Sequence, residues 1–205
     1  MKNKPKITGK SYIDKSVKFG KNVTIYPNNI IKGNTIIEDN VILLPNNYIE
    51  DSYIFSGAYV EYSHIVKSII KNNSIVGPFS RLRPNSVVGE NCKIGNFVEV
   101  KNSTIGNGTK ASHLAYIGDA EIGDNCNIGC GAIFVNYNGK EKNKSIVGNN
   151  AFIGSNVNVI APINIADNSY ICAGTTITKD TNVDDFVIGR VRETIKSDYA
   201  GKYRK

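Results

Sequence analysis

The 205-residue sequence predicts an all-β fold, a single-stranded parallel β-helix built from hexapeptide repeats. The first observation is an apolar residue at every sixth position, a spacing that neither an α-helix nor an ordinary strand selects. The second is the Gly that often follows this residue, with Asn or Asp in between, because these residues tolerate the backbone of tight corners. A strand of a few residues cannot bury its apolar side chain alone, so successive coils must stack.

The repeat covers nearly the whole chain. Near the N-terminus the apolar residues are Ile7, Ile13, Phe19, Ile25, Ile31, Ile37, Leu43 and Ile49. The middle keeps the pattern with occasional five-residue steps from Ile54 to Phe134, and strict spacing returns from Val147 to Val183. Three faces of six residues make a coil of about 18 residues, so about ten coils are expected.

Two segments interrupt the pattern. Residues 106–116 skip one apolar anchor, and residues 138–144 form a polar insertion without repeat register. Irregular segments on a rigid scaffold often carry function. We expect residues 1–184 to form the β-helix with its insertion at 138–144, and residues 185–205 to form a short basic C-terminal tail.

Composition excludes several classes. The formal charge is +7, but Lys and Arg are spread along the chain and concentrate only in the last 16 residues. A phosphorylated small-molecule substrate explains this balance at least as well as nucleic acid. No apolar run is long enough to cross a bilayer, so we expect a cytoplasmic protein without a membrane partner. The four cysteines form no CxxC pair, which predicts free thiols and no metal site.

Five segments resemble, in the same order, the acetyltransferase domain of the bacterial bifunctional N-acetylglucosamine-1-phosphate uridyltransferase/glucosamine-1-phosphate acetyltransferase family. These segments are Gly77-Pro-Phe-Ser-Arg-Leu-Arg-Pro84, Gly95-Asn-Phe-Val-Glu-Val-Lys101, Lys110-Ala-Ser-His-Leu-Ala-Tyr-Ile-Gly-Asp119, Asn127-Ile-Gly-Cys-Gly131 and Asn136-Tyr-Asn-Gly139. The resemblance implies a left-handed β-helix. The family's uridyltransferase domain is missing from the sequence, so no uridyltransferase activity is expected.

The resemblance also implies an activity, an acetyl-CoA-dependent N-acetyltransferase of an amino-sugar phosphate. The implied acceptor is glucosamine 1-phosphate, a cell-wall precursor, and no metal is needed for the transfer. The family further implies a homotrimer with active sites between subunits. The insertion at 138–144 is long enough to reach a neighbour, and the flat faces of a solenoid can pack around a threefold axis.

His113 is the candidate catalytic residue. Acetyl transfer needs a neutral amine, and an imidazole with a pKa near 6.5 accepts the ammonium proton at physiological pH. His113 lies in the segment 106–116 and matches the family's general base. His64, the other histidine, is expected to be structural.

The resemblance assigns the acceptor to four residues, Arg83, Lys101, Tyr116 and Asn127. A forked guanidinium and a compact ammonium suit a phosphate dianion. Asn127 matches a sugar-contacting position of the family, and an amide can both donate to and accept from a hydroxyl. Glu99 either orients the site near His113 or is an exposed carboxylate, and the sequence leaves both readings open.

The resemblance assigns the cofactor to seven residues: Cys130, Asn136, Tyr137, Lys142, Ser155, Ala173 and Arg190. The acetyl end of the cofactor meets the backbone N–H of Cys130 and the side chains of Asn136 and Tyr137. Ser155, Ala173 and Arg190 follow the pantetheine arm to the CoA phosphates. Lys142 reaches the cofactor of a neighbouring subunit.

Three other functions are conceivable for a β-helix of this kind. A metal-dependent lyase or hydrolase on this scaffold needs about three imidazole ligands, and the chain has two histidines. A non-catalytic scaffold or regulatory subunit needs only the apolar register, and so does not explain the base, phosphate and CoA positions together. The same chemistry on a different amino sugar stays open.

Overall fold

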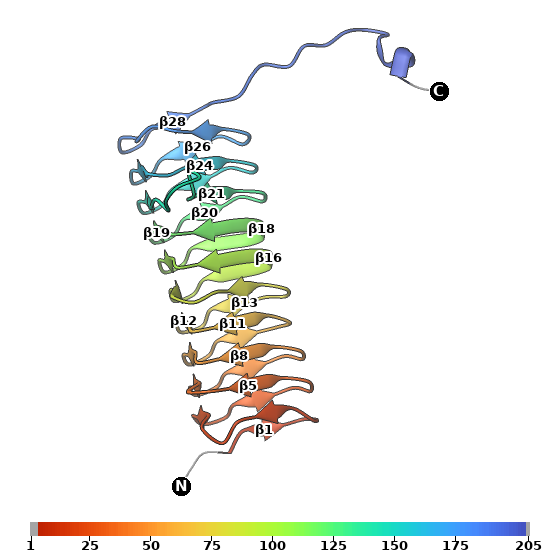
Figure 1. Cartoon of the computed structure of the whole chain (residues 1–205), viewed down its shortest axis with the longest axis vertical. Helices are drawn as coiled ribbons and strands as arrows, with labels where there is room; N and C mark the ends of the chain where they lie inside the picture. Colours follow the sequence, from red (N-terminus) through yellow and green to blue (C-terminus); the bar gives the residue numbers. More distant parts are fainter. Residues whose placement is uncertain (1–3, 204–205) are drawn as a thin grey trace.

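The computed structural model describes residues 4–203, and it is a parallel β-helix, as predicted. Figure 1 shows the coils stacked in sequence order into an elongated body, with the N-terminus at one end and an extended C-terminal segment leaving the other. Every pairing between two strands is parallel. The described residues contain no α-helix, only a 3₁₀ turn, η1 (Ala200–Tyr203).

The strands lie on three faces. The first face carries β1 (Lys6–Ile7), β4 (Thr24–Ile25), β7 (Ile42–Leu43), β10 (Tyr59–Val60), β13 (Ile75–Val76), β20 (Asn127–Ile128), β23 (Phe152–Ile153), β26 (Tyr170–Ile171) and β28 (Phe186–Val187). The second carries β2 (Tyr12–Ile13), β5 (Ile30–Lys32), β8 (Tyr48–Glu50), β11 (His64–Val66), β14 (Arg81–Leu82), β21 (Ile133–Val135), β24 (Asn158–Ile160) and β27 (Thr176–Ile177). The third carries β3 (Lys18–Phe19), β6 (Ile36–Ile37), β9 (Tyr53–Ile54), β12 (Ser68–Ile70), β15 (Ser86–Val88), β17 (Thr104–Ile105), β19 (Ala120–Ile122), β22 (Ser145–Val147) and β25 (Ile163–Ile165).

Two long strands join the first face to the second. β16 (Lys93–Lys101) and β18 (Lys110–Gly118) continue around the corner between these faces and pair with each other along most of their length. Their continuity joins the first two faces into one 19-stranded sheet, whereas the third face is a separate 9-stranded sheet. This corner is the place where the candidate catalytic residue lies.

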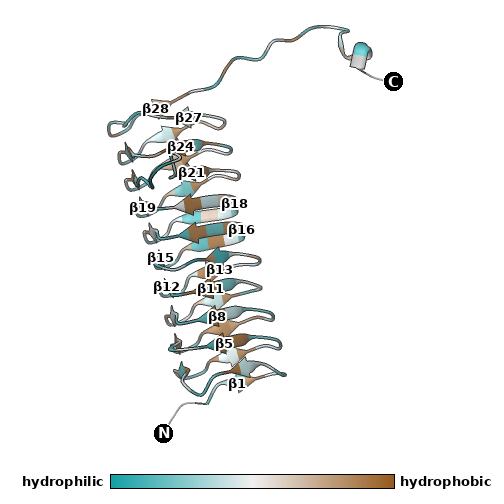
Figure 2. Cartoon of the chain, in the orientation of Figure 1, coloured by the Kyte–Doolittle hydropathy of each residue, from teal (hydrophilic) through white to brown (hydrophobic). Residues whose placement is uncertain are grey.

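The core is the column of sixth-position residues inside the coils. Ile94 and Val100 of β16 are both 0% exposed, although the same strand carries the exposed Lys93 and the half-buried Asn96 and Glu99. Figure 2 shows this alternation of hydrophobic and hydrophilic residues along β16 and β18. Cys92 and Cys126 are buried against the same core, as predicted, and all four cysteines are free thiols.

Residues 106–116 are regular, and the predicted interruption was wrong. Ala111 occupies the missing anchor position: it is 0% exposed and pairs with Ile94 below and Ile128 above. A single methyl group fills the anchor, so a search for large apolar residues passes over it. The chain therefore keeps its register through His113.

One corner column is unusual. Tyr62, Phe79, Phe97 and Leu114 follow one another at the corner between the first and second faces, all exposed and all with φ between 39° and 60°. Asn and Gly adopt this conformation readily, whereas other residues pay about 1–2 kcal/mol. The rings of Phe79 and Phe97 stack at 5.7 Å. We call these four residues the apolar corner column.

The last coil extends beyond residue 184. β28 pairs with β26, so that Phe186 stacks on Tyr170 with ring centroids 5.1 Å apart. The chain then leaves the stack, and Val191 is 94% exposed. No helix within residues 4–203 is long and apolar enough to span a membrane.

Candidate active site

His113 stands at the edge between the first and second faces, one residue before the corner at Leu114. Its imidazole is exposed, and its Nδ1 atom lies 2.7 Å from Oδ1 of Asn96, its register partner on β16. An amide oxygen can only accept a hydrogen bond, so Nδ1 carries the proton. In the neutral imidazole, this tautomer leaves the lone pair on Nε2, where a general base needs it.

Three predicted cofactor residues stand above His113 along the same edge. The pairing of β18 with β20 places Cys130 one coil above His113. The pairing of β20 with β23 and of β23 with β26 places Ser155 and Ala173 one coil further each. Arg190 continues the line, since its Nη1 donates to the carbonyl of Ala173 at 3.0 Å. We call the line from His113 to Arg190 the donor edge.

The donor edge is open to solvent because the corner residues beside it are small. Above Leu114, the corner position is filled by Gly131, Asn156 and Gly174 in place of large side chains. Cys130 is exposed, and its backbone N–H donates to no acceptor among residues 4–203. The small corner residues leave room for an extended ligand along this edge, and the free N–H of Cys130 can donate a hydrogen bond to it.

Three cations gather on the second face and its far corner. Arg83 Nη1 lies 3.0 Å from Oε1 of Glu99, and Lys101 Nζ lies 3.1 Å from Oδ2 of Asp119. Lys142 extends from the insertion toward Lys101. The Lys101 ammonium favours the neutral Lys142 amine, to which it can donate, and repels the charged form, so the pKa of Lys142 is lowered.

Lys101 keeps its proton more firmly than Lys142. Partial burial acts to lower the pKa of Lys101, but contacts with Lys142 and with the Asp119 carboxylate outweigh it, and the pKa is raised. The side chains of Lys101 and Asp119 are only 15% and 11% exposed. Tyr116 lies on the same face, paired in register with Glu99.

The insertion forms a compact loop. Tyr137 and Lys142 make an antiparallel bridge, and Asn138 Oδ1 accepts the backbone N–H groups of Lys140 and Glu141, both at 2.9 Å. Tyr137 is 56% exposed, and its hydroxyl donates to the carbonyl of Gly139. The loop therefore holds Tyr137 and Lys142 at the far corner of the second face.

Asn127 is apart from the other predicted acceptor residues. It lies on β20 of the first face, above Lys110 and below Phe152. Arg83, Lys101 and Tyr116 are all on the second face. Within one chain, the corner separates Asn127 from the cations.

The sequence reasoning missed two residues of the site, Asn96 and Asp119. Both lie inside the segments that carry the family resemblance. Asn96 is one coil before His113, so the coil register, once known, pairs the two side chains. Asp119 accepts from Lys101, Asn102 and Asn136, three residues that no single spacing brings together.

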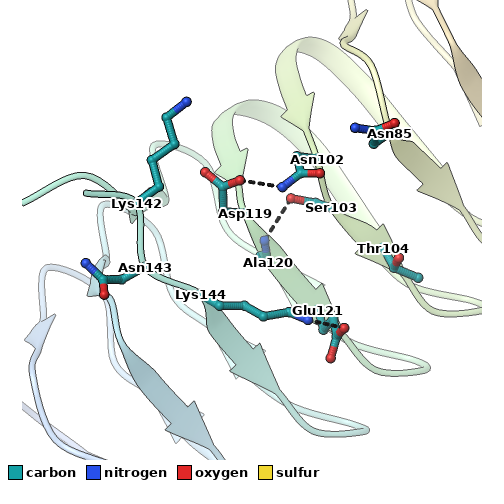
Figure 3. Close-up of a pocket in the computed structure, with 10 residues that line it drawn as sticks. All are labelled: Asn85, Asn102, Ser103, Thr104, Asp119, Ala120, Glu121, Lys142, Asn143 and Lys144. Atoms are coloured by element: carbon teal, nitrogen blue, oxygen red, sulfur yellow. Dashed lines mark hydrogen bonds and ion pairs between the residues drawn. The ribbon is translucent and has the colours of Figure 1, made fainter.

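A polar hollow of about 360 Å³ lies beside the cations (Figure 3). Its lining comes from the corner and third face of three successive coils and from the end of the insertion: Asn85, Asn102, Ser103, Thr104, Asp119, Ala120, Glu121, Lys142, Asn143 and Lys144. Lys144 and Glu121 form an ion pair across it. Within residues 4–203, no group of three or more His, Cys, Asp or Glu side chains is arranged to hold a metal ion.

Two protein-family models match parts of the chain. The bacterial transferase hexapeptide repeat (six repeats) matches residues 144–179. The GMPPB C-terminal domain family matches residues 7–90 and 64–138. The chain belongs to this family of hexapeptide-repeat β-helices.

Among curated proteins, the chain is similar to the bifunctional protein GlmU. It is 49% identical to that of Clostridium novyi over 183 residues, which are 89% of this chain and 40% of the relative. It is 48% identical to that of Clostridium kluyveri over 192 residues, 94% of this chain and 42% of the relative. The resemblance to the acetyltransferase domain is thereby confirmed, and the chain spans about two fifths of the length of these relatives.

Solved structures share the fold. The UDP-N-acetylglucosamine acyltransferase LpxA of Bacteroides fragilis is 23% identical with a TM-score of 0.56, covering 83% of this chain and 66% of that one. A mutant GDP-perosamine N-acetyl transferase of Caulobacter crescentus, in complex with CoA and GDP-perosamine, is 22% identical with a TM-score of 0.51. That likeness covers 57% of this chain and 53% of the other.

Proposed function

We propose that the chain is an acetyl-CoA-dependent N-acetyltransferase of an amino-sugar phosphate, with glucosamine 1-phosphate as the acceptor. The observation that carries the proposal is the donor edge, which leads without interruption from His113 to Arg190. Successive coils are about 4.8 Å apart, so Ala173 lies roughly 14 Å from the base. An extended pantetheine arm follows this line with its thioester at His113 and its phosphates at Arg190.

The chemistry at His113 is direct transfer. The acceptor's ammonium loses a proton to Nε2 of His113, and the free amine attacks the thioester carbonyl. The carbon–sulfur bond breaks as the amide forms, the second proton of the attacking nitrogen ends on the leaving CoA thiolate, and the proton held by His113 is released to solvent. The N–H of Cys130 is free to stabilise the oxygen of the tetrahedral intermediate, a contribution that typically matters greatly in acyl transfer.

The cations select the acceptor. Arg83 and Lys101 are the proposed acceptor ligands, and Lys142, assigned to a neighbouring subunit's cofactor, adds a third positive charge near the two carboxylates of Glu99 and Asp119. The excess positive charge favours an anionic group on the sugar, and a forked guanidinium with an ammonium suits a phosphate. GlmU relatives at up to 49% identity support an amino-sugar acceptor.

A panel of acceptors tests the proposal. Release of the CoA thiol from acetyl-CoA is measured with glucosamine, glucosamine 1-phosphate, glucosamine 6-phosphate and the corresponding galactosamine compounds. We expect the highest kcat/KM with glucosamine 1-phosphate, since both its amine and its phosphate have partners in the site. Thiol release with none of the acceptors would contradict the enzymatic proposal, and preference for another sugar would change the acceptor.

We further propose a homotrimer whose active sites lie between subunits. Asn127 lies around the corner from Arg83 and Lys101, so it can contact the same acceptor only if the first face of one subunit meets the second face of another. The apolar corner column supplies exposed rings beside this corner. Exposed apolar patches on a soluble protein commonly mark contacts with a partner.

Replacement of Phe97 by asparagine is expected to weaken the trimer without unfolding the coil. Asn tolerates the φ of 60° at this corner while removing a ring that is 59% exposed. Light scattering across micromolar concentrations should show a trimer for the parent and a shift toward monomer for the variant. Ile69→Thr, which removes an exposed apolar side chain from the third face, is the control and should remain trimeric. A monomeric parent protein would refute the proposal.

A further inference from the structure

We propose that Asp119 is a positioning residue that links the acceptor side of the site to the acetyl side. The inference rests on the proposed function and its trimer, because it assigns Lys101 to the acceptor and Asn136 to the acetyl group of a neighbouring subunit's cofactor. Asn136 lies across the second face from Cys130. Asp119 itself touches neither substrate in this scheme. It acts by fixing the directions of two side chains that do.

The contacts of Asp119 are asymmetric. Its Oδ2 accepts from Lys101 Nζ at 3.1 Å and from Asn136 Nδ2 in a short hydrogen bond. Its Oδ1 accepts from Asn102 Nδ2 at 2.6 Å, a bond that Figure 3 shows at the corner of the stack. Oδ2 therefore accepts hydrogen bonds from the two side chains with proposed functions, Lys101 and Asn136. Oδ1 accepts from Asn102, to which no function is assigned.

The backbone holds Asp119 in place. Its φ is 50°, a corner conformation, and its N–H donates to the carbonyl of Lys101 at 3.0 Å. Asn136 follows β21 one coil above and is only 7% exposed. With one N–H committed to Asp119, the Asn136 amide cannot flip, so its carbonyl oxygen is held in one direction.

The negative charge of Asp119 also affects the two neighbouring ammonium groups. Burial acts to raise the pKa of its carboxyl group, but hydrogen bonds from Asn102, Asn136 and Lys101 outweigh burial, and the pKa is lowered. The group is therefore a carboxylate at neutral pH. Its charge offsets the repulsion between Lys101 and Lys142, so both ammonium groups can remain at the same corner.

Asp119→Asn tests the linkage, since it keeps the shape and removes the charge. The new amide can present an acceptor to only some of the three donors. We expect the KM for the phosphorylated acceptor to rise by at least about tenfold, the loss of one charge-assisted hydrogen bond. We also expect kcat to fall, because Asn136 loses its orientation. In a Lys101→Met background, the same substitution should raise this KM by less than about twofold.

Asp51→Asn is the matched control. Asp51 occupies a corner with φ of 48°, its N–H donates to a carbonyl one coil earlier, and its Oδ1 accepts the N–H of Asn34. It lies in the N-terminal coils, far from the cations. The control should have parental kinetics. An equal loss in Asp51→Asn and Asp119→Asn, or full additivity of Asp119→Asn with Lys101→Met, would reduce Asp119 to a structural role and overturn the inference.

A measurement without turnover separates this inference from the proposed function. NMR titration of ¹³Cε-labelled lysine should show that Asp119→Asn lowers the pKa of Lys101, because the carboxylate that stabilises its charge is gone. This result stands even if the protein acetylates none of the sugars. An unchanged Lys101 pKa would overturn the linkage whatever the acceptor proves to be.

Discussion

Replacement of His113 by alanine is expected to lower the rate of acetyl transfer by about 10²- to 10⁴-fold, the usual contribution of a general base. Asn96 holds Nδ1 of His113 as a donor, and Nε2 is the remaining proton acceptor. Without it, the acceptor's ammonium must lose its proton to water. The defect should shrink as the pH rises toward the pKa of the amine, since more free amine is then present.

The same variant should bind acetyl-CoA as the parent does. Cys130 provides the readout, because it is exposed beside His113 whereas Cys92, Cys126 and Cys172 are buried. Acetyl-CoA should protect Cys130 from alkylation equally in parent and variant. His64→Ala, which removes an exposed imidazole stacked on Tyr48, is the control and should retain full activity. Full activity in His113→Ala would remove this residue from the mechanism.

Arg83→Ala and Lys101→Ala are expected to raise the KM for the sugar phosphate by about one to two powers of ten. Each loses a charge-assisted hydrogen bond worth roughly 1.5–3 kcal/mol. The KM for acetyl-CoA should change little. The donor edge lies at the corner between the first and second faces, whereas Arg83 and Lys101 lie at the opposite edge of the second face. Steady-state kinetics with glucosamine 1-phosphate and with glucosamine compare the two acceptors directly.

Arg81→Ala is the matched control for this pair. Arg81 lies on β14, two residues before Arg83, its side chain is 57% exposed, and its Nη1 atom is 4.0 Å from Oε2 of Glu99. Loss of this surface charge should change the KM by less than about twofold. Equal effects of Arg83→Ala on phosphorylated and unphosphorylated acceptors would show that the guanidinium does not hold a phosphate.

Much of the fold was predictable because the β-helix uses one rule repeatedly. A large apolar residue at each sixth position marks a strand, and this rule located nearly every strand correctly. It failed at Ala111, where a methyl group meets the full-sized side chains of Ile94 and Ile128 in neighbouring coils. Size alone does not reveal that a coil can be completed by a small anchor.

The sequence proposed the members of the candidate site but not their arrangement in space. The site residues came from family resemblance, and the coil register then placed Cys130, Ser155 and Ala173 above His113. The hydrogen bonds of Asp119 depend on how the insertion folds back over the corner, which no repeat spacing encodes. The separation of Asn127 from Arg83 likewise follows from the bend of β16 and β18 around the corner.

The donor edge makes the stack a molecular ruler. Each coil contributes one position to the edge, so the distance from His113 to Arg190 is set by a whole number of coils and by no single side chain. Adding a coil below the apolar corner column lengthens the rod and leaves that distance intact. Adding one between Cys130 and Ser155 moves Arg190, the proposed partner of the CoA phosphates, by about 4.8 Å relative to His113, the proposed base. In this architecture, the number of coils between His113 and Arg190 therefore sets the length of an extended ligand that can contact both residues.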